Sequence, residues 1–420
     1  MSDLFRSALS ARIAKLPRDL PPTSEFSTMS PYDEAEDEDE GSDALGQLPG
    51  SGLGPPAVPR SKPRAARAPN PDFAPISGKD YFVDALQVAV PARGLDVRVY
   101  YTPPAPKEDS GTVLVCHHGA GYSGLSFAWF AREVAALSRG ELGVLALDAR
   151  RHGKTASTAD KEDMDLSIGV LVEDFVATLR AVFPDPAAAP TLVLVGHSMG
   201  GSVVVRASGP LLDGAGAKGY RVAGVAVLDV VEGTAIDALP HMHSLLNARP
   251  DGFDSVEEAV EWHVKTKTIR NADSARVSVP ATIVPTSAPA SSTTSASPAS
   301  SSTSASRCNA SGVSGSVHAY TWRTPLRSTA AYWQGWFTNL STLFLGARTA
   351  RLLVLAGTDR LDRALTIGQM QGKFQMAVVP GAGHVVHEDD PTHVAELLVD
   401  FWRRNDRLRL PFKVRGVGEV

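Results

Sequence analysis

The sequence TLVLVGHSMGGSVVV, residues 191–205, joins an apolar run to a glycine-rich turn and then to a second run of small and β-branched residues. The first run predicts a strand buried on both faces, and the second predicts a helix. Between them, Gly196-His-Ser198-Met-Gly200 matches G-x-S-x-G, in which a sharp strand-to-helix turn lifts a serine above a sheet. The glycines are needed because this turn leaves no room for a Cβ on either side. We therefore expect Ser198 to be a nucleophile.

Other apolar runs repeat this form, because each is rich in Leu or β-branched residues and stops at Gly, Asp or His. They are TVLVCHHG, GVLALDARRHG, VAGVAVLDVVEG, ARLLVLAGTD and FQMAVVPGAGH. Helical patterns alternate with them, at residues 126–140 and 165–183, and another lies at 392–405. This alternation predicts a mostly parallel, doubly wound α/β sheet whose polar site lies at the carboxyl ends of the strands. The run LDVRVYYTP, residues 95–103, alternates like an edge strand.

The chain divides into four predicted segments. Residues 1–75 are rich in Pro, Gly, Ser and blocks of charge, which predicts a disordered tail. Residues 76–231 and 350–420 carry the two parts of the α/β core. Residues 232–349 interrupt the alternation, which predicts a cap inserted between late core strands. A Ser/Thr/Pro-rich tract at 280–316 is too polar to pack, so we expect an unstructured loop there.

Composition excludes several functional classes. The net charge of −5 argues against a general nucleic-acid or membrane-surface binder, and no apolar stretch approaches the length of a membrane span. Cys116 and Cys308 are far apart, and Cys116 lies in an apolar run, which favours a buried reduced thiol. We expect a cytoplasmic or nuclear protein. The amphipathic N-terminus keeps a mitochondrial presequence as the less favoured alternative.

A nucleophilic serine needs a base and an acid. His384 follows the last apolar run, where this kind of sheet places its base, whereas His387 is expected on the surface. The acid must orient the imidazole, and two apolar runs end in a candidate, Asp229 and Asp359. The order serine, acid, histidine along the chain permits both. The residues alone leave this choice open.

Backbone N–H groups would stabilise the oxyanion formed after attack. Met199 directly follows the serine, and Ala120 lies in the loop after TVLVCHHG, so their N–H groups are the predicted donors. His152, which ends another apolar run, suits a structural hydrogen bond. The pairs His117-His118 and His241/His243 lack acidic or thiol companions, so we expect no metal site. No phosphate-loop lysine follows the glycines, which argues against a nucleotide cofactor.

Several longer stretches together resemble the protein phosphatase methylesterases, over about residues 82–404. These stretches are HGAGYSGLSFA, DARRHGKT, GHSMGGS, LDVVEGTAIDAL, YWQGWFTNLSTLFL, LAGTDRLDRALTIGQMQGKFQM and GHVVHEDDP. The resemblance implies an α/β-hydrolase fold and a triad of Ser198, Asp229 and His384, which leaves Asp359 a structural role. It also implies a serine carboxylesterase, without cofactor, that hydrolyses the methyl ester of the C-terminal leucine of the type 2A protein phosphatase catalytic subunit.

That phosphatase subunit is then the expected partner, and we expect the chain itself to be a monomer. The aromatic residues of the cap, Trp333 and Trp336 among them, either contact this partner or form the core of the cap. Two other functions stay open. One is a general esterase or thioesterase acting on small molecules, and the other is a non-catalytic protein that holds inactive phosphatase.

Overall fold

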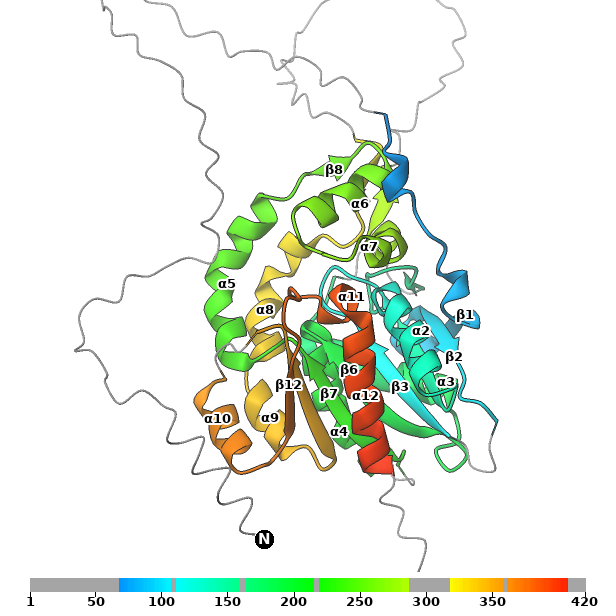
Figure 1. Ribbon diagram of the computed structural model, residues 1–420, viewed down its shortest axis with the longest axis vertical. Helices are drawn as coiled ribbons and strands as arrows, with labels where there is room; N and C mark the ends of the chain where they lie inside the picture. Colours follow the sequence, from blue (N-terminus) through cyan, green and yellow to red (C-terminus); the bar gives the residue numbers. More distant parts are fainter. Residues whose placement is uncertain are drawn as a thin grey trace, which may run out of the picture. The chain divides into compact units, whose positions relative to one another are not determined.

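The computed structural model describes most of the chain after the N-terminal segment (Figure 1). The described residues are 68–106, 111–158, 164–214, 219–286, 318–357 and 361–406. The acidic and basic blocks predicted as tail lie outside them. The tail was predicted to reach residue 75, but Asn70 caps a 3-10 turn at Pro71–Phe73. The Ile76 N–H also donates to the Arg276 carbonyl at 3.0 Å, so residues 70–75 belong to the folded structure and not to the predicted tail.

Among the described residues, the main sheet has the order β1-β2-β4-β3-β6-β7-β11-β12, and β5 pairs with β2. Its strands are β1 (Asp84–Val90), β2 (Leu95–Thr102), β3 (Thr112–His117), β4 (Leu142–Leu147), β5 (Ala156–Ser157), β6 (Thr191–His197), β7 (Val222–Leu228), β11 (Ala350–Leu355) and β12 (Gln375–Val378). From β4 to β12 all pairs are parallel, which confirms the predicted fold class. The edge position predicted for β2 is wrong, because β1 covers it on one side and β4 on the other.

Helices cover both faces of this sheet, because successive residues of each buried strand point to opposite sides. Val113 and Val115 of β3 belong to one apolar cluster, whereas Leu114 and Cys116 belong to the other. On the second face, α2 (Ala128–Leu137) packs against α12 (Pro391–Asp406), and both lie in front of the strands in Figure 1. On the first face, α3 (Ile168–Val182) packs against α4 (Met199–Asp213). No described helix is long and apolar enough to cross a membrane.

The residues between β7 and β11, called the insert below, carry helices and a second small sheet. Its elements are α5 (Glu232–Asn247), β8 (Gly252–Phe253), α6 (Val256–Lys265), α7 (Ala272–Ser278), β9 (Ile283–Pro285), β10 (Tyr320–Trp322), α8 (Ala330–Phe337) and α9 (Leu340–Gly346). The predicted loop at 280–316 begins too early, because β9 pairs with β10 and buries Ile283. Residues 287–317 lie outside the described part, and the domain boundaries themselves stay a prediction.

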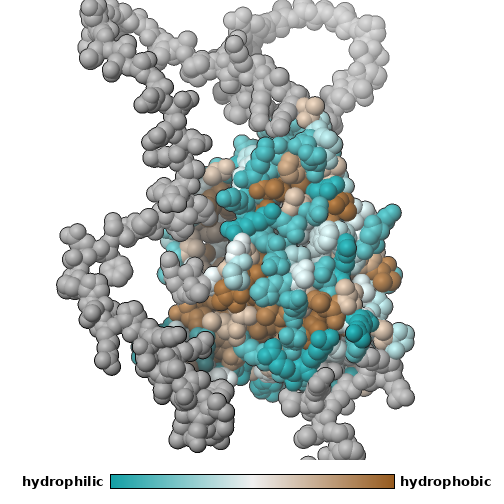
Figure 2. Space-filling view, viewed as in Figure 1, coloured by the Kyte–Doolittle hydropathy of each residue, from teal (hydrophilic) through white to brown (hydrophobic). Residues whose placement is uncertain are grey.

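The two tryptophans predicted to contact a partner do not form exposed apolar surface, which lies partly on the insert and partly on the helix after β11. Figure 2 shows apolar surface around α9 and α10 (Arg363–Met370), where Leu343, Ile367 and Met370 are exposed. Trp333 and Trp336 are instead only 4% and 2% exposed.

Candidate active site

Ser198 sits at the turn between β6 and α4. Its φ of 51° and ψ of −120° lie in a region that non-glycine residues rarely adopt. The flanking glycines are sterically required, since a Cβ at Gly196 would overlap the Gly200 carbonyl and one at Gly200 would overlap the His117 carbonyl. The predicted strand, turn and helix are therefore all present, and the turn leaves Ser198 only half-buried.

Asp229 follows β7, the neighbour of β6, and it also has a positive φ, of 49°. Its Oδ2 lies 2.8 Å from Nδ1 of His384, and its Oδ1 accepts from the Ala356 N–H at 2.8 Å. A carboxylate in this position fixes the imidazole with Nδ1 protonated, so that Nε2 is free to act as a base. Asp359, the alternative acid, lies outside the described residues.

The loop that carries His384 runs from β12 to α11 (Val386–Asp389). The His384 side chain is 54% exposed, in contrast to the neighbouring histidines. His387, expected on the surface, is fully buried because its ring stacks on Phe127, with ring centroids 4.3 Å apart. Burial lowers the pKa of His387 to about 3, so this imidazole stays neutral.

The loop after β3 passes beside Ser198, the predicted nucleophile. A Cβ at Gly119 would come within 3.2 Å of the Ser198 Cβ, which places the following residue, Ala120, close to the serine. The Met199 N–H opens α4 and therefore has no intrahelical acceptor. Both predicted oxyanion donors thus belong to backbone next to Ser198, and their role stays a prediction.

Two buried histidines shape this loop. His118 Nδ1 donates to the Gly119 carbonyl at 2.7 Å, and His152 Nε2 accepts from the Gly121 N–H at 2.9 Å. Burial lowers the pKa of His152 to about 4, which keeps its Nε2 an acceptor. The structural hydrogen bond predicted for His152 is therefore confirmed.

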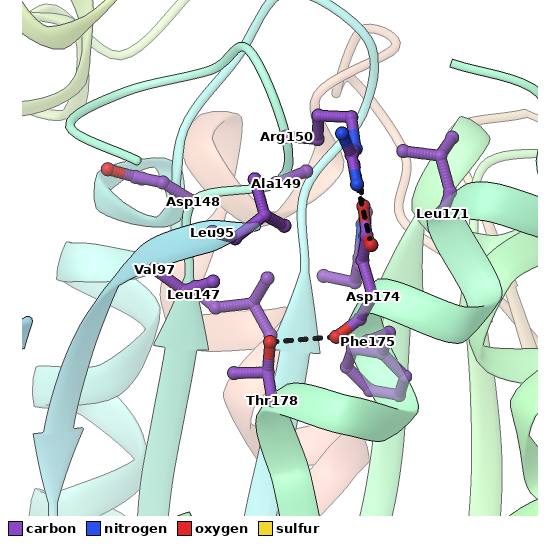
Figure 3. A pocket seen from close by; sticks show the side chains of 11 residues that line it. Leu95, Val97, Leu147, Asp148, Ala149, Arg150, Leu171, Asp174, Phe175 and Thr178 are labelled. Atoms are coloured by element: carbon purple, nitrogen blue, oxygen red, sulfur yellow. Dashed lines mark hydrogen bonds and ion pairs between the residues drawn. The ribbon is translucent and has the colours of Figure 1, made fainter. Parts of the chain in front are cut away.

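A further layer of contacts supports His152. Its Nδ1 donates to the Arg150 carbonyl at 2.8 Å, and the Arg150 guanidinium bonds both oxygens of Asp174 on α3, at 2.7 and 3.0 Å. Figure 3 shows this pair at the edge of a small cavity. Its lining comprises Leu95, Val97, His117, Leu147, Asp148, Ala149, Arg150, Leu171, Asp174, Phe175 and Thr178. Ser198, Asp229 and His384 are not among them, so this cavity is not the place where the ester would bind.

The tryptophans predicted to contact a partner join the insert to the core instead. Trp336 Nε1 donates to the Leu166 carbonyl at 2.7 Å, and the Trp336 carbonyl accepts from Ser202 on α4. Trp333 Nε1 donates to Thr329 Oγ1 at 2.9 Å. Their burial excludes both side chains from a free surface, which corrects the partner-binding prediction in favour of its alternative.

No group of three or more His, Cys, Asp or Glu side chains suited to a metal ion occurs within the ranges described above. Cys116 is fully buried, and burial raises the pKa of its thiol. It therefore behaves as a small apolar side chain of the core and not as a reactive group.

The fold and the strand-turn-helix at Ser198 define the class as an α/β hydrolase. The profile of the Alpha/beta hydrolase family matches residues 114–397. A hydrolase of E-2-(acetamidomethylene)succinate, at 18% identity and a TM-score of 0.53, shares the fold over 76% of this chain and 99% of its own.

Two relatives narrow the class. Protein phosphatase methylesterase 1 of Cryptococcus neoformans var. neoformans serotype D is 42% identical, with 100% of this chain and 96% of the relative covered. The protein of the same name from Aspergillus fumigatus is 40% identical, with coverage of 99% and 92%. The chain belongs to the protein phosphatase methylesterase family, and it is a carboxylesterase.

Proposed function

We propose that this chain demethylates a protein phosphatase, hydrolysing the methyl ester on the C-terminal leucine of the type 2A catalytic subunit. The observation that carries the proposal is the 2.8 Å contact between Asp229 and His384, beside a strained Ser198, in a chain of this family. The names of the relatives supply the substrate class.

The residues support an acyl-enzyme route. Ser198 Oγ attacks the ester carbonyl while His384 Nε2 takes its proton, and Asp229 stabilises the imidazolium. The N–H groups of Met199 and Ala120 stabilise the oxyanion. The tetrahedral intermediate expels methoxide, which leaves as methanol with the proton from His384. Water, deprotonated by His384, then attacks the acyl carbonyl. The bond to Ser198 Oγ breaks, His384 returns the proton to the serine oxygen, and the leucine carboxylate is released without a cofactor.

We also propose a cellular compartment for this protein. A buried, reduced Cys116 fits a reducing compartment, and we place the chain in the cytoplasm or nucleus, acting as a monomer on its phosphatase partner.

Methanol release from methylated phosphatase catalytic subunit tests the proposal, with Ser198→Ala as the matched control. We expect release by the wild type only, together with a loss of the methyl group from the phosphatase C-terminus. A wild type that hydrolyses small methyl esters but leaves the phosphatase methylated would instead indicate a general esterase. No hydrolysis of either ester, with a stable phosphatase complex, would indicate a binding protein.

A further inference from the structure

His197 is the last residue of β6 and directly precedes Ser198. Its ring is fully buried, and its Nε2 lies 2.9 Å from the backbone carbonyl oxygen of His384. A carbonyl oxygen only accepts, so Nε2 must carry the proton and donate. One hydrogen bond therefore joins the nucleophile strand to the backbone of the residue that we assign as the base.

The ring of His197 is enclosed on several sides. The ring centroids of His384 and His387 each lie 4.7 Å from that of His197, and the Tyr122 ring lies 5.8 Å away. A Cβ at Gly119 would come within 2.7 Å of His197 Nδ1, so the loop beside the nucleophile also packs against this ring. This packing leaves the imidazole little freedom to rotate. The His197 ring thus contacts both the loop that carries His384 and the loop after β3 that carries Gly119 and Ala120.

The His384 loop needs such a contact. The ring of His384 is hydrogen-bonded to Asp229, a contact that restrains the side chain and does not itself hold the backbone. Two other contacts hold the backbone before His384: the Gly383 N–H donates to Asp389 of the adjacent α11 at 2.6 Å, and Arg270 of the insert donates to the Gly381 carbonyl. The hydrogen bond from His197 is made to the backbone of His384 itself, and its donor is the residue directly before Ser198.

We propose that His197 is a positioning residue that sets the distance between Ser198 Oγ and His384 Nε2 by binding the His384 carbonyl. This role rests on the proposed assignment of Ser198 and His384, but not on the identity of the ester. Burial, with His387 and His384 close by, lowers the pKa of His197 well below its usual range. The Nε2–H donor therefore stays neutral while His384 gains and loses its proton.

Three substitutions separate the donor from the ring. His197→Gln places an amide N–H near the position of Nε2, His197→Asn stops short of it, and His197→Phe keeps the ring without a donor. We expect His197→Phe and His197→Asn to lower kcat on methylated phosphatase by about 10²-fold, with KM within about twofold, because small misplacements of catalytic groups have that effect. We expect His197→Gln to recover at least about a tenth of the wild-type kcat.

The rate at which a fluorophosphonate labels Ser198 is the second measurement, since it needs the serine and its base but no phosphatase. It should fall in the same order as kcat. Thermal unfolding of each variant shows which of them fold. The proposal would be overturned if His197→Phe were labelled and turned over substrate at the wild-type rates. It would also be overturned if a folded His197→Gln had a kcat and labelling rate no higher than those of His197→Phe. If the wild type is labelled at Ser198 but releases no methanol, the proposed substrate is wrong. The labelling rates of the variants still test the positioning role in that case.

Discussion

The two halves of the candidate site are built differently. Ser198 and Asp229 each directly follow a buried parallel strand, and each has a positive φ, of 51° and 49°. His384 instead lies in a loop well beyond the end of β12, and its side chain is 54% exposed. The neighbouring strands β6 and β7 thus hold the proposed nucleophile and the proposed acid through the sheet itself. The proposed base, His384, is held by its hydrogen bond to Asp229, by the one that its carbonyl accepts from His197, and by contacts around its loop.

Within the loop half, the largest loss of activity should come from replacing His384. We expect His384→Gln to lower kcat on methylated phosphatase by about 10⁶-fold, the size of effect seen when the base of a serine triad is removed. His393→Gln, a substitution on the partly exposed start of α12, is the matched control and should keep wild-type turnover. Comparable activity in the two variants would refute the assignment of the base.

The buried histidines should govern stability in acid. Burial lowers the pKa values of His117, His152 and His263 to about 4, from the usual 6.5. Below pH 6.5 the unfolded chain binds protons that the folded chain does not. Each of these histidines therefore lowers the free energy of unfolding as the pH drops from 6.5 towards 4, by up to about 3 kcal/mol. Together they outweigh Asp148, whose pKa burial raises to about 6 and which acts in the opposite sense. Urea unfolding at pH 7.5, 6 and 5 measures this, and a flat profile would contradict it.

The junction between insert and core should depend on Trp336. Truncating this 2% exposed side chain in Trp336→Ala is expected to lower the free energy of unfolding by about 3–5 kcal/mol. Met370→Ala, at an 85% exposed side chain, is the control and should change it by less than about 0.5 kcal/mol. Urea unfolding gives both values, and equal effects would mean that the insert does not pack as described.

The strand half can be tested with two glycines of α4. A Cβ at Gly200 would overlap the His117 carbonyl, whereas a Cβ at Gly209 would meet nothing within 4 Å. We expect Gly200→Ala to destabilise the chain by about 3 kcal/mol. Gly209→Ala should change its stability by less than about 1 kcal/mol, because the gain from alanine in a helix is offset by crowding of the new Cβ against Pro210. Thermal unfolding measures both changes, and a neutral Gly200→Ala would show that the turn can relax.

The part of the site that follows buried strands can be predicted well from the sequence, because the residues that form it are neighbours along the chain. The apolar run, the glycines and Ser198 are contiguous, so the strand, turn and helix could be predicted together. The choice between Asp229 and Asp359 could not be made from spacing, because both follow apolar runs that the parallel sheet brings to the same edge.

The loop half is set by contacts between distant residues, and there the predictions were weaker. The surface position expected for His387 was wrong because packing of Phe127, 260 residues away in sequence, buries that ring. Trp333 and Trp336 carry no sequence signal that separates a buried cap core from an exposed interface. His197 was overlooked because its partner is a backbone carbonyl, and the only signal was its place inside Gly-His-Ser.

The most direct measurement of the central claim is the turnover of Asp229→Asn and Asp359→Asn on methylated phosphatase, followed by methanol release. We expect a loss of about 10⁴-fold for Asp229→Asn, because the asparagine favours the wrong tautomer of His384, and a far smaller loss for Asp359→Asn. The reverse order would show that the acid comes from the strand after the insert and would contradict the triad of Ser198, Asp229 and His384.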